Sequence, residues 1–315
     1  MSQPSLVGYR SWLGLVAALA AVLFSFGCGR ARRQSAAEQQ TFATAAAAAN
    51  ALFTALQSND DATLLRIFGP SGSAILSSGN PDLDHSHRAR FVAAYRRMHR
   101  LQAEPDGSVL LIIGTENWPF PVPLVESNDA WRFDTAAGER HILDRRIGRN
   151  ELAAIRACHE LVAAEREYFA RQGHVYAQRL ASTAGQRDGL YWPGRTPVSP
   201  IGPRLAEAAA AAPSSRPFFG YYFRLLTAQG SAAPGGARSY LHDGRLTRGF
   251  AFLAYPAEYR NSGVMTFVVG ANDVVYQQDL GPNTEALAHS IAAFDPATGW
   301  QLAEAAPRIT AVAVH

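Results

Sequence analysis

The sequence predicts an α+β fold in two domains, each with helices packed on a mainly antiparallel sheet. In residues 41–148, and again in residues 149–306, segments with the 3.6-residue period of a helix precede short segments rich in β-branched and aromatic residues. Helices followed by strands, rather than alternating with them, are typical of an α+β domain. A chain of 315 residues, 48% hydrophobic and 17% charged, is long enough and apolar enough for two cores.

The first domain is predicted to open with helices. Helical patterns cover residues 41–58, 61–68 and 88–101. A turn at Asn59–Asp60 separates the first two helices, and Gly69–Pro70 ends the second. Asp60 or Asp61 can cap the second helix, because a side-chain oxygen there accepts hydrogen bonds from unpaired N–H groups. Residues 78–87, SGNPDLDHSH, are predicted to form a loop.

Three strands are predicted to follow these helices. Residues 108–114, SVLLIIG, form a continuous apolar run that is typical of a buried strand. Residues 120–127 contain two prolines, which cannot donate to a sheet ladder, so an edge strand is expected there. In residues 129–135, Trp131 and Phe133 fall on one face of a third strand.

The second domain is predicted to contain one long helix, an irregular stretch and four strands. Apolar residues at helical spacing predict the helix over residues 150–171, and residues 184–205 are rich in Gly and Pro. Asp243–Gly244 indicates a two-residue hairpin, and Asn272–Asp273 a second turn. The strand-like segments are residues 218–230, 248–256, 264–270 and 274–281, and a closing helix covers residues 283–294.

The first residues have the pattern of an export signal. Arg10 provides the positive start, and Trp12–Phe26 form an apolar run. This run of 15 residues is shorter than the roughly 20 that a membrane-spanning helix needs, so a signal peptide is expected over residues 1–27. Residues 28–40 are then a linker, and residues 307–315 a C-terminal tail.

Cys28 is the candidate for lipid attachment. The pair Gly27–Cys28 resembles the end of a bacterial lipobox, although Ser25 stands where Leu is usual. Cleavage by the ordinary signal peptidase and an uncleaved anchor stay open as alternatives. The second cysteine, Cys158, lies beside the apolar face of the predicted long helix, so we expect a small buried residue and no disulfide.

Composition excludes several classes of function. All 29 basic residues are arginines, so a P-loop lysine, a Schiff-base lysine and a kinase-type lysine are excluded. A nucleotide-driven enzyme is therefore not expected. The formal charge is only +3 and the arginines are scattered, whereas nucleic-acid binding needs a basic cluster. We therefore expect no nucleic-acid partner.

Four side chains in the predicted loop are candidate metal ligands. They are Asp82, Asp84, His85 and His87. Their donor atoms suit a divalent cation, but a loop this short supplies only about two of the three or four ligands that zinc needs. His159–Glu160 begins like the zinc-protease motif HExxH, but Ala163 stands in place of the second histidine. No metal and no cofactor are expected.

No segment matches a catalytic motif, and no catalytic residue is assigned. Residues 69–73, GPSGS, lack the spacing of a G-x-S-x-G elbow, although nine histidines leave open a triad assembled from distant residues. Gly235–Gly236 could hold an anion, but a simple turn is the expected role. Aromatic residues could form a contact surface, with core packing expected for most of them; they are Tyr191, Trp192, Tyr221, Tyr222 and Phe223.

Several segments along the chain form a recognisable set. Among them are SPIGP, GYYFRLLTAQG, GFAFLAYPAEY, SGVMTFVV and VVYQQDLGPNT, and the segments of the set together cover most of residues 50–300. They resemble the signature segments of a bacterial exported family known only as a domain of unknown function. Asn272–Asp273 departs from the Asp-Gly that this family favours at the turn. The resemblance brings no catalytic or binding residue.

Two looser likenesses concern the halves of the chain. Residues 41–148 resemble the cone-shaped NTF2-like domains, in which two helices precede a curved sheet. The later helix and sheet are similar to the head domains of type IV pilin-like proteins, which implies a link to pilus or secretion machinery. The charged segment ERHILDRRIGR stands where a polymerising pilin has an apolar helix, so polymerisation is not expected.

The function expected from the sequence is that of an exported bacterial envelope protein. We expect a lipoprotein on the periplasmic side, held to the membrane through Cys28, with a non-enzymatic binding or assembly role and other envelope proteins as partners. An exported hydrolase with a site built from scattered His and Asp residues is one alternative. A carrier that holds a small ligand in a pocket of the first domain is another.

Overall fold

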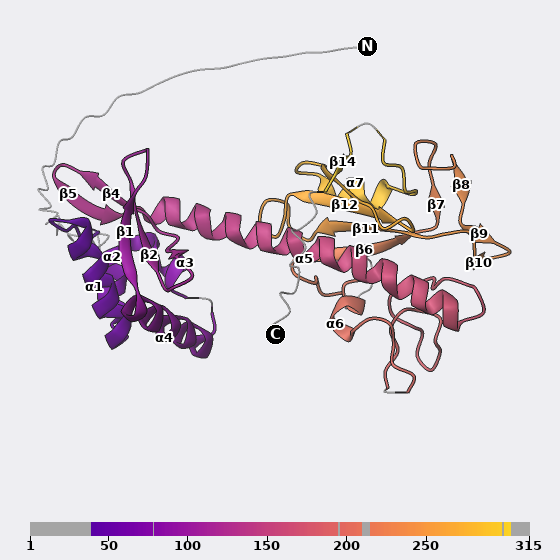
Figure 1. Ribbon diagram of the computed structural model, residues 1–315, viewed down its shortest axis with the longest axis horizontal. Coiled ribbons are helices and arrows are strands. Elements are labelled where there is room, and N and C mark those ends of the chain that lie inside the picture. The colour runs from indigo at the N-terminus through magenta and orange to yellow at the C-terminus, as the bar shows by residue number, and fades with distance from the viewer. Residues whose placement is uncertain (1–38, 78, 195, 210–214, 298, 304–315) are drawn as a thin grey trace, which may run out of the picture.

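The computed structural model describes residues 39–303, apart from residues 78, 195, 210–214 and 298. Helices and antiparallel sheets confirm the predicted α+β class. Buried hydrophobic residues form two clusters, one within residues 45–133 and one within residues 154–294. Figure 1 shows two groups of elements at the two ends of one long helix. The predicted division into domains at residues 148 and 149 stays a prediction.

The predicted signal peptide, Cys28 and the predicted C-terminal tail lie outside the described residues. Among the residues that the structure does describe, none of the helices is both long enough and apolar enough to cross a membrane.

Side-chain caps fix where the helices of the first group begin. Each cap accepts a hydrogen bond from a backbone N–H in the first helical turn. The helices and their caps are α1 (Ala45–Ser58) with Thr44, α2 (Asp61–Phe68) with Asp60, and α4 (Pro81–Arg97) with Asn80. A 3₁₀ turn, η1 (Pro70–Gly72), and a short helix, α3 (Ser73–Leu76), lie between α2 and α4. The first two predicted helices and the cap at Asp60 are confirmed.

The predicted loop over residues 78–87 is wrong from Pro81 onward, because α4 begins there. Asn80 Oδ1 accepts a hydrogen bond from the Leu83 N–H at 3.2 Å, and Pro81 occupies the first helical position, where no N–H is needed. Asp82 and Asp84 lie in the first turn, where the helix dipole favours negative charge. The predicted end of this helix, beyond Arg97, is also wrong because the chain there enters a strand.

The first sheet has the strand order β1–β2–β4–β5, with β3 paired to β2. Its strands are β1 (His99–Ala103), β2 (Val109–Ile113), β3 (Trp118–Pro119), β4 (Leu124–Ser127) and β5 (Ala130–Phe133). The sequence did not reveal β1, because all of its residues are exposed and show no apolar alternation. The predicted edge strand over residues 120–127 is corrected: β4 lies between β2 and β5 and begins only after Pro123.

The long helix α5 (Thr135–Arg171) begins well before the predicted residue 150 and has 37 residues, or about 55 Å of length. Asp134 caps it by accepting a hydrogen bond from the Ala137 N–H. Its residues 139–149 include no buried residue, so no apolar stripe marked this part as helical. Gly138 lies against Val122: a Cβ there would come within 2.6 Å of a Val122 methyl group. Glycine therefore lets α5 dock on the first group of elements.

The second sheet has the antiparallel order β14–β13–β12–β11–β6, and its four predicted strands are confirmed. The strands are β6 (Tyr221–Leu226), β11 (Ala251–Pro256), β12 (Met265–Gly270), β13 (Val275–Asp279) and β14 (Gln301–Leu302). Two hairpin ladders stand apart from it: β7 (Ala228–Gln229) with β8 (Arg238–Ser239), and β9 (Leu241–His242) with β10 (Arg245–Leu246). Asp243 and Gly244 form the predicted turn, both with positive φ, 49° and 72°.

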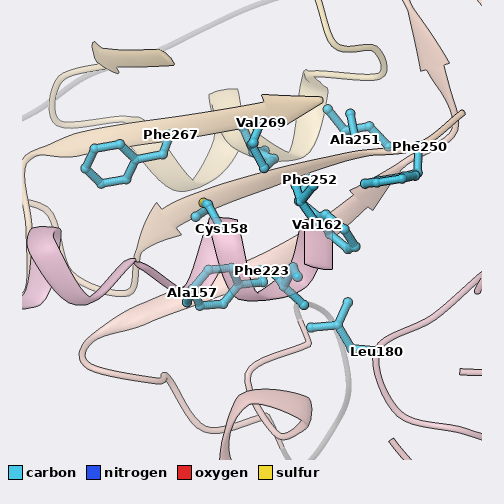
Figure 2. Close-up of a cluster of buried hydrophobic side chains, with 14 of the residues drawn as sticks. Ala157, Cys158, Val162, Leu180, Phe223, Phe250, Ala251, Phe252, Phe267 and Val269 are labelled. Atoms are coloured by element: carbon cyan, nitrogen blue, oxygen red, sulfur yellow. The ribbon is translucent and has the colours of Figure 1, made fainter. Parts of the chain in front are cut away.

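Helix α5 packs on this second sheet through small and branched side chains. Figure 2 shows Cys158 and Val162 among Phe223, Phe252 and Phe267. Cys158 is fully buried, which confirms the prediction of a small core residue. The closing helix α7 (Thr284–Ser290) contacts β11. In the predicted irregular stretch, the described residues form only an isolated bridge and part of the short helix α6 (Pro203–Ala206).

Candidate binding site

The structure does not gather the four metal-ligand candidates into a metal site. Asp82, Asp84, His85 and His87 all lie in the first two turns of α4. On a helix only residues three or four apart share a face, so Asp82 falls beside His85 and Asp84 beside His87, but the two pairs point to different sides of α4. Within residues 39–303, gaps aside, no group of three or more His, Cys, Asp or Glu side chains could hold a metal ion.

His159 forms an exposed pair with Asp273, in the turn between β12 and β13. The distance between His159 Nδ1 and Asp273 Oδ1 is 2.7 Å. Arg166 Nη2 also donates to the Ala271 carbonyl, at 2.9 Å, so two contacts hold this turn against α5. In the described part of the chain, no serine, threonine or cysteine hydrogen-bonds to His159, and the pair therefore does not form a catalytic triad.

The other candidates from the sequence have structural roles. At the Gly235–Gly236 turn the Gly236 carbonyl accepts a hydrogen bond from Gln229 Nε2 at 2.7 Å, as in a simple turn. Tyr221 and Phe223 are fully buried, as predicted for most of the aromatic residues, and the Tyr221 hydroxyl donates to the Met265 carbonyl at 2.8 Å. Tyr222 and Tyr191 are half-buried, and Trp192 is buried.

A pocket of about 210 Å³ with both polar and apolar lining lies near the C-terminal end of α5. Four parts of the chain form it: the last turns of α5, the segment that follows, the irregular stretch, and strand β10. We call it the α5-end pocket, and its lining residues are Tyr168, Val175, Tyr176, Gln178, Arg179, Asp188 and Arg245. No motif in the sequence marks any of these residues.

The two arginines of the α5-end pocket differ in their partners. Arg179 Nε lies 3.3 Å from Asp188 Oδ2, and Arg179 Nη1 donates to Thr183 Oγ1. Burial opposes ionisation of Asp188, but hydrogen bonds from Thr183 and the charge of Arg179 bring its pKa below the usual range. Arg245 is exposed, and its side chain makes no hydrogen bond or ion pair within the described residues, although its backbone pairs with β9. Its guanidinium is thus available to a ligand.

Glu165 lies beneath the lining tyrosines and is 1% exposed. Its Oε2 accepts a hydrogen bond from the Ala177 N–H at 2.8 Å. Burial raises the pKa of Glu165 to about 8, although this hydrogen bond acts in the opposite direction. The carboxyl group is therefore mostly protonated at neutral pH, next to Tyr168 and Tyr176, whose pKa values burial and the Glu165 charge both raise.

One sequence pattern could have revealed Glu165. Glu165 interrupts an apolar stripe on one helix face. Leu161 lies four residues before it, Val162 three residues before it and Tyr168 three residues after it. A carboxylate inside such a stripe must either turn outward or be buried. No comparable pattern marks Arg245, which only the folding of the Asp243–Gly244 hairpin brings to α5.

A second, larger groove of about 380 Å³ lies between α1 and α4. Most of its lining residues are exposed, among them Gln57, Asn59 and Arg96, and His85 lies at its side. The space between these helices and the first sheet is filled by buried side chains such as Phe91 and Phe133. The groove is thus a surface feature rather than the enclosed apolar pocket that a carrier in the first domain needs.

Comparison with known protein families identifies the family of this chain. The family DUF2950, described as a protein of unknown function, matches residues 39–303, which is most of the chain. The chain belongs to this family. The predicted resemblance to a family of unknown function is therefore confirmed. No curated protein and no solved structure matched, so the likenesses to NTF2-like and pilin-head domains are not confirmed.

The thiol of Cys158 is expected to be unreactive in this folded DUF2950 protein. Burial raises the pKa of its thiol to about 12, and the charge of Asp273 adds to this effect. In a Cys28→Ala variant, whose only thiol is Cys158, a disulfide reagent should react on the order of 1,000-fold more slowly with native than with unfolded protein. Rapid labelling of the native protein would contradict the burial of Cys158.

Proposed function

We propose that this DUF2950 protein is an exported, lipid-anchored envelope protein with a non-enzymatic binding role, and that its α5-end pocket binds a small carboxylate. The observation that carries the pocket assignment is Arg245: a guanidinium without a partner in the described residues, at the edge of a pocket. Arginine binds carboxylates through two parallel hydrogen bonds, which gives such a site both affinity and orientation.

The other lining groups restrict the ligand. Asp188 is neutralised by Arg179, and Glu165 below is largely uncharged, so the formal charge left for a ligand is that of Arg245. Tyr168 and Tyr176 offer ring surface, and Tyr176 stacks on Phe169 with ring centroids 4.5 Å apart. Drug-sized ligands need roughly 300–1,000 Å³, so a pocket of about 210 Å³ suits a smaller molecule. An aromatic or short aliphatic carboxylate fits these properties.

Support for the anchor comes from the N-terminal sequence. Arg10, the apolar run Trp12–Phe26 and the pair Gly27–Cys28 follow the order of a bacterial lipoprotein signal. Intact-mass spectrometry of the protein isolated from the membrane fraction should show a chain that begins at Cys28 and carries a diacylglyceryl-type addition. The substitution Cys28→Ala should abolish this addition. A free N-terminus beyond residue 28 would contradict lipid anchoring and leave export as the remaining proposal.

Arg245→Ala is expected to weaken carboxylate binding by about 10- to 100-fold, because it removes a charge-assisted bidentate contact. Titration calorimetry with benzoate, succinate and glutamate would measure this. Arg238→Ala removes an equally exposed arginine from β8, outside the pocket, and should leave binding unchanged. Equal losses in both variants, or no binding of any of the three carboxylates to the unmodified protein, would refute the pocket assignment.

A further inference from the structure

We propose that the first half of α5 and the neighbouring β3 dock on an anionic phospholipid surface. This proposal rests on the proposed lipid anchor, which would hold the chain near a bilayer. We call the docking region the Trp118–Arg149 surface; it comprises Trp118, Ile142, Arg145 and Arg149. There the guanidinium of Arg145 lies over the exposed Trp118 ring, and exposed Ile142 and Arg149 share a helix face with Arg145.

The apolar residues of this surface are Trp118, in β3, and Ile142, in α5. Trp118 is 46% exposed and Ile142 is 37% exposed, so both can contact a partner. The guanidinium carbon of Arg145 lies 5.4 Å from the centre of the Trp118 ring, and Arg145 Nη1 donates to the Pro119 carbonyl at 2.9 Å. Tryptophan beside arginine is the combination that favours the headgroup layer of a membrane.

The charge of the surface is positive. Ile142, Arg145 and Arg149 follow one another at the i+3 and i+4 spacing that places side chains on one helix face. The side chain of Arg149 is exposed and makes no hydrogen bond or ion pair within the described residues, so its charge is uncompensated there. Asp144 lies roughly 160° around the helix from Ile142, whereas Glu139, three residues before Ile142, lies at the margin of the same face, where two arginines outnumber this one carboxylate. An anionic surface is the complementary partner.

The reach of the proposed anchor is compatible with this surface. Gln39, the first described residue, donates its side-chain amide to the Phe133 carbonyl at 2.7 Å, and thus lies at the start of α5. The chain from Cys28 to Gln39 is at most roughly 40 Å long when extended, and Arg145 is about 16 Å along α5 from its cap. Arg30, Arg32 and Arg33 in that connecting segment also favour anionic headgroups.

A vesicle assay with unacylated protein tests the surface separately from the anchor. The described members of both buried clusters lie well after residue 28, so the mature chain 28–315 with Cys28→Ala retains all of them. This protein should float with vesicles of phosphatidylglycerol and phosphatidylcholine, bind less at high salt, and not float with phosphatidylcholine alone. Absence of flotation with the anionic vesicles at low salt would overturn the docking proposal, whether or not Cys28 is acylated in cells.

Paired substitutions show whether vesicle binding depends on this surface or only on the overall charge of the protein. Arg145→Gln with Arg149→Gln should weaken vesicle partitioning roughly 20- to 30-fold, at about fivefold per arginine. The matched pair Arg216→Gln with Arg238→Gln removes the same charge from exposed positions elsewhere and should have little effect. Trp118→Phe should remove a blue shift of tryptophan emission on vesicle binding. Equal losses in both arginine pairs, or an unchanged blue shift, would contradict the proposal.

Discussion

The stability of this protein is expected to fall as pH rises from about 5 to about 8, and Glu165→Gln should remove most of that loss. The pKa of Glu165 is about 8 in the folded chain and close to 4.5 when unfolded. Between these values the folded state holds a proton that the unfolded state has released, so raising the pH favours unfolding. The expected slope is about 1.4 kcal/mol per pH unit for this one group.

Urea unfolding at a series of pH values measures this slope. Glutamine keeps an acceptor for the Ala177 N–H but cannot ionise, so the variant should match the original protein near pH 5 and exceed its stability near pH 8. Glu167→Gln is the matched control: Glu167 is exposed, two residues along α5, in an ion pair with Arg171. The control should leave the slope unchanged. A slope in Glu165→Gln equal to that of the original protein would show that Glu165 ionises freely in the fold.

Phe252→Ala is expected to destabilise the second buried cluster by about 3–5 kcal/mol. Phe252 is fully buried in β11, between β12 and β6, and α5 covers this part of the sheet (Figure 2). Truncation to alanine removes the ring and leaves a cavity that close-packed neighbours fill only in part. The loss is comparable with the whole stability of many domains, which is about 5–15 kcal/mol.

The same variant tests the predicted two domains. Residues 139–149 of α5 contribute nothing to either buried cluster, so the two clusters are expected to unfold in separate steps. Phe252→Ala should lower one thermal transition, and Phe68→Ala, in the first cluster, should lower the other. A single transition lowered by both substitutions would mean that α5 couples the clusters into one cooperative unit, against the domain prediction.

Local chemistry made much of the fold predictable from the sequence. Asp60 ahead of α2 and the Asp243–Gly244 turn act through neighbouring backbone groups alone, so they form where the sequence places them. Continuous apolar runs such as β2 and β12 must be buried wherever the chain folds. The cap and proline that begin α4 at Asn80–Pro81 are equally local, and the loop predicted there overlooked them.

Elements without a buried face could be recognised only in the tertiary structure. Strand β1 is exposed along its whole length, and residues 139–149 of α5 bury nothing, so neither carries an apolar period. Backbone hydrogen bonding to β2 orders the former, and continuation of the helix from Asp134 orders the latter. Hydrogen bonds between backbone groups are independent of side-chain type, and the sequence pattern does not record them.

Residue patterns were enough to predict the α+β class, the burial of Cys158, the absence of lysine chemistry and the family to which the chain belongs. The candidate site, in contrast, exists only in the folded chain. Arg245 comes from a hairpin more than 70 residues beyond Tyr168, and only the packing of α5 against the following segment buries Glu165 and shifts its pKa. Ionisation and ligand contact depend on what surrounds a group in space, which neighbouring residues in the sequence do not specify.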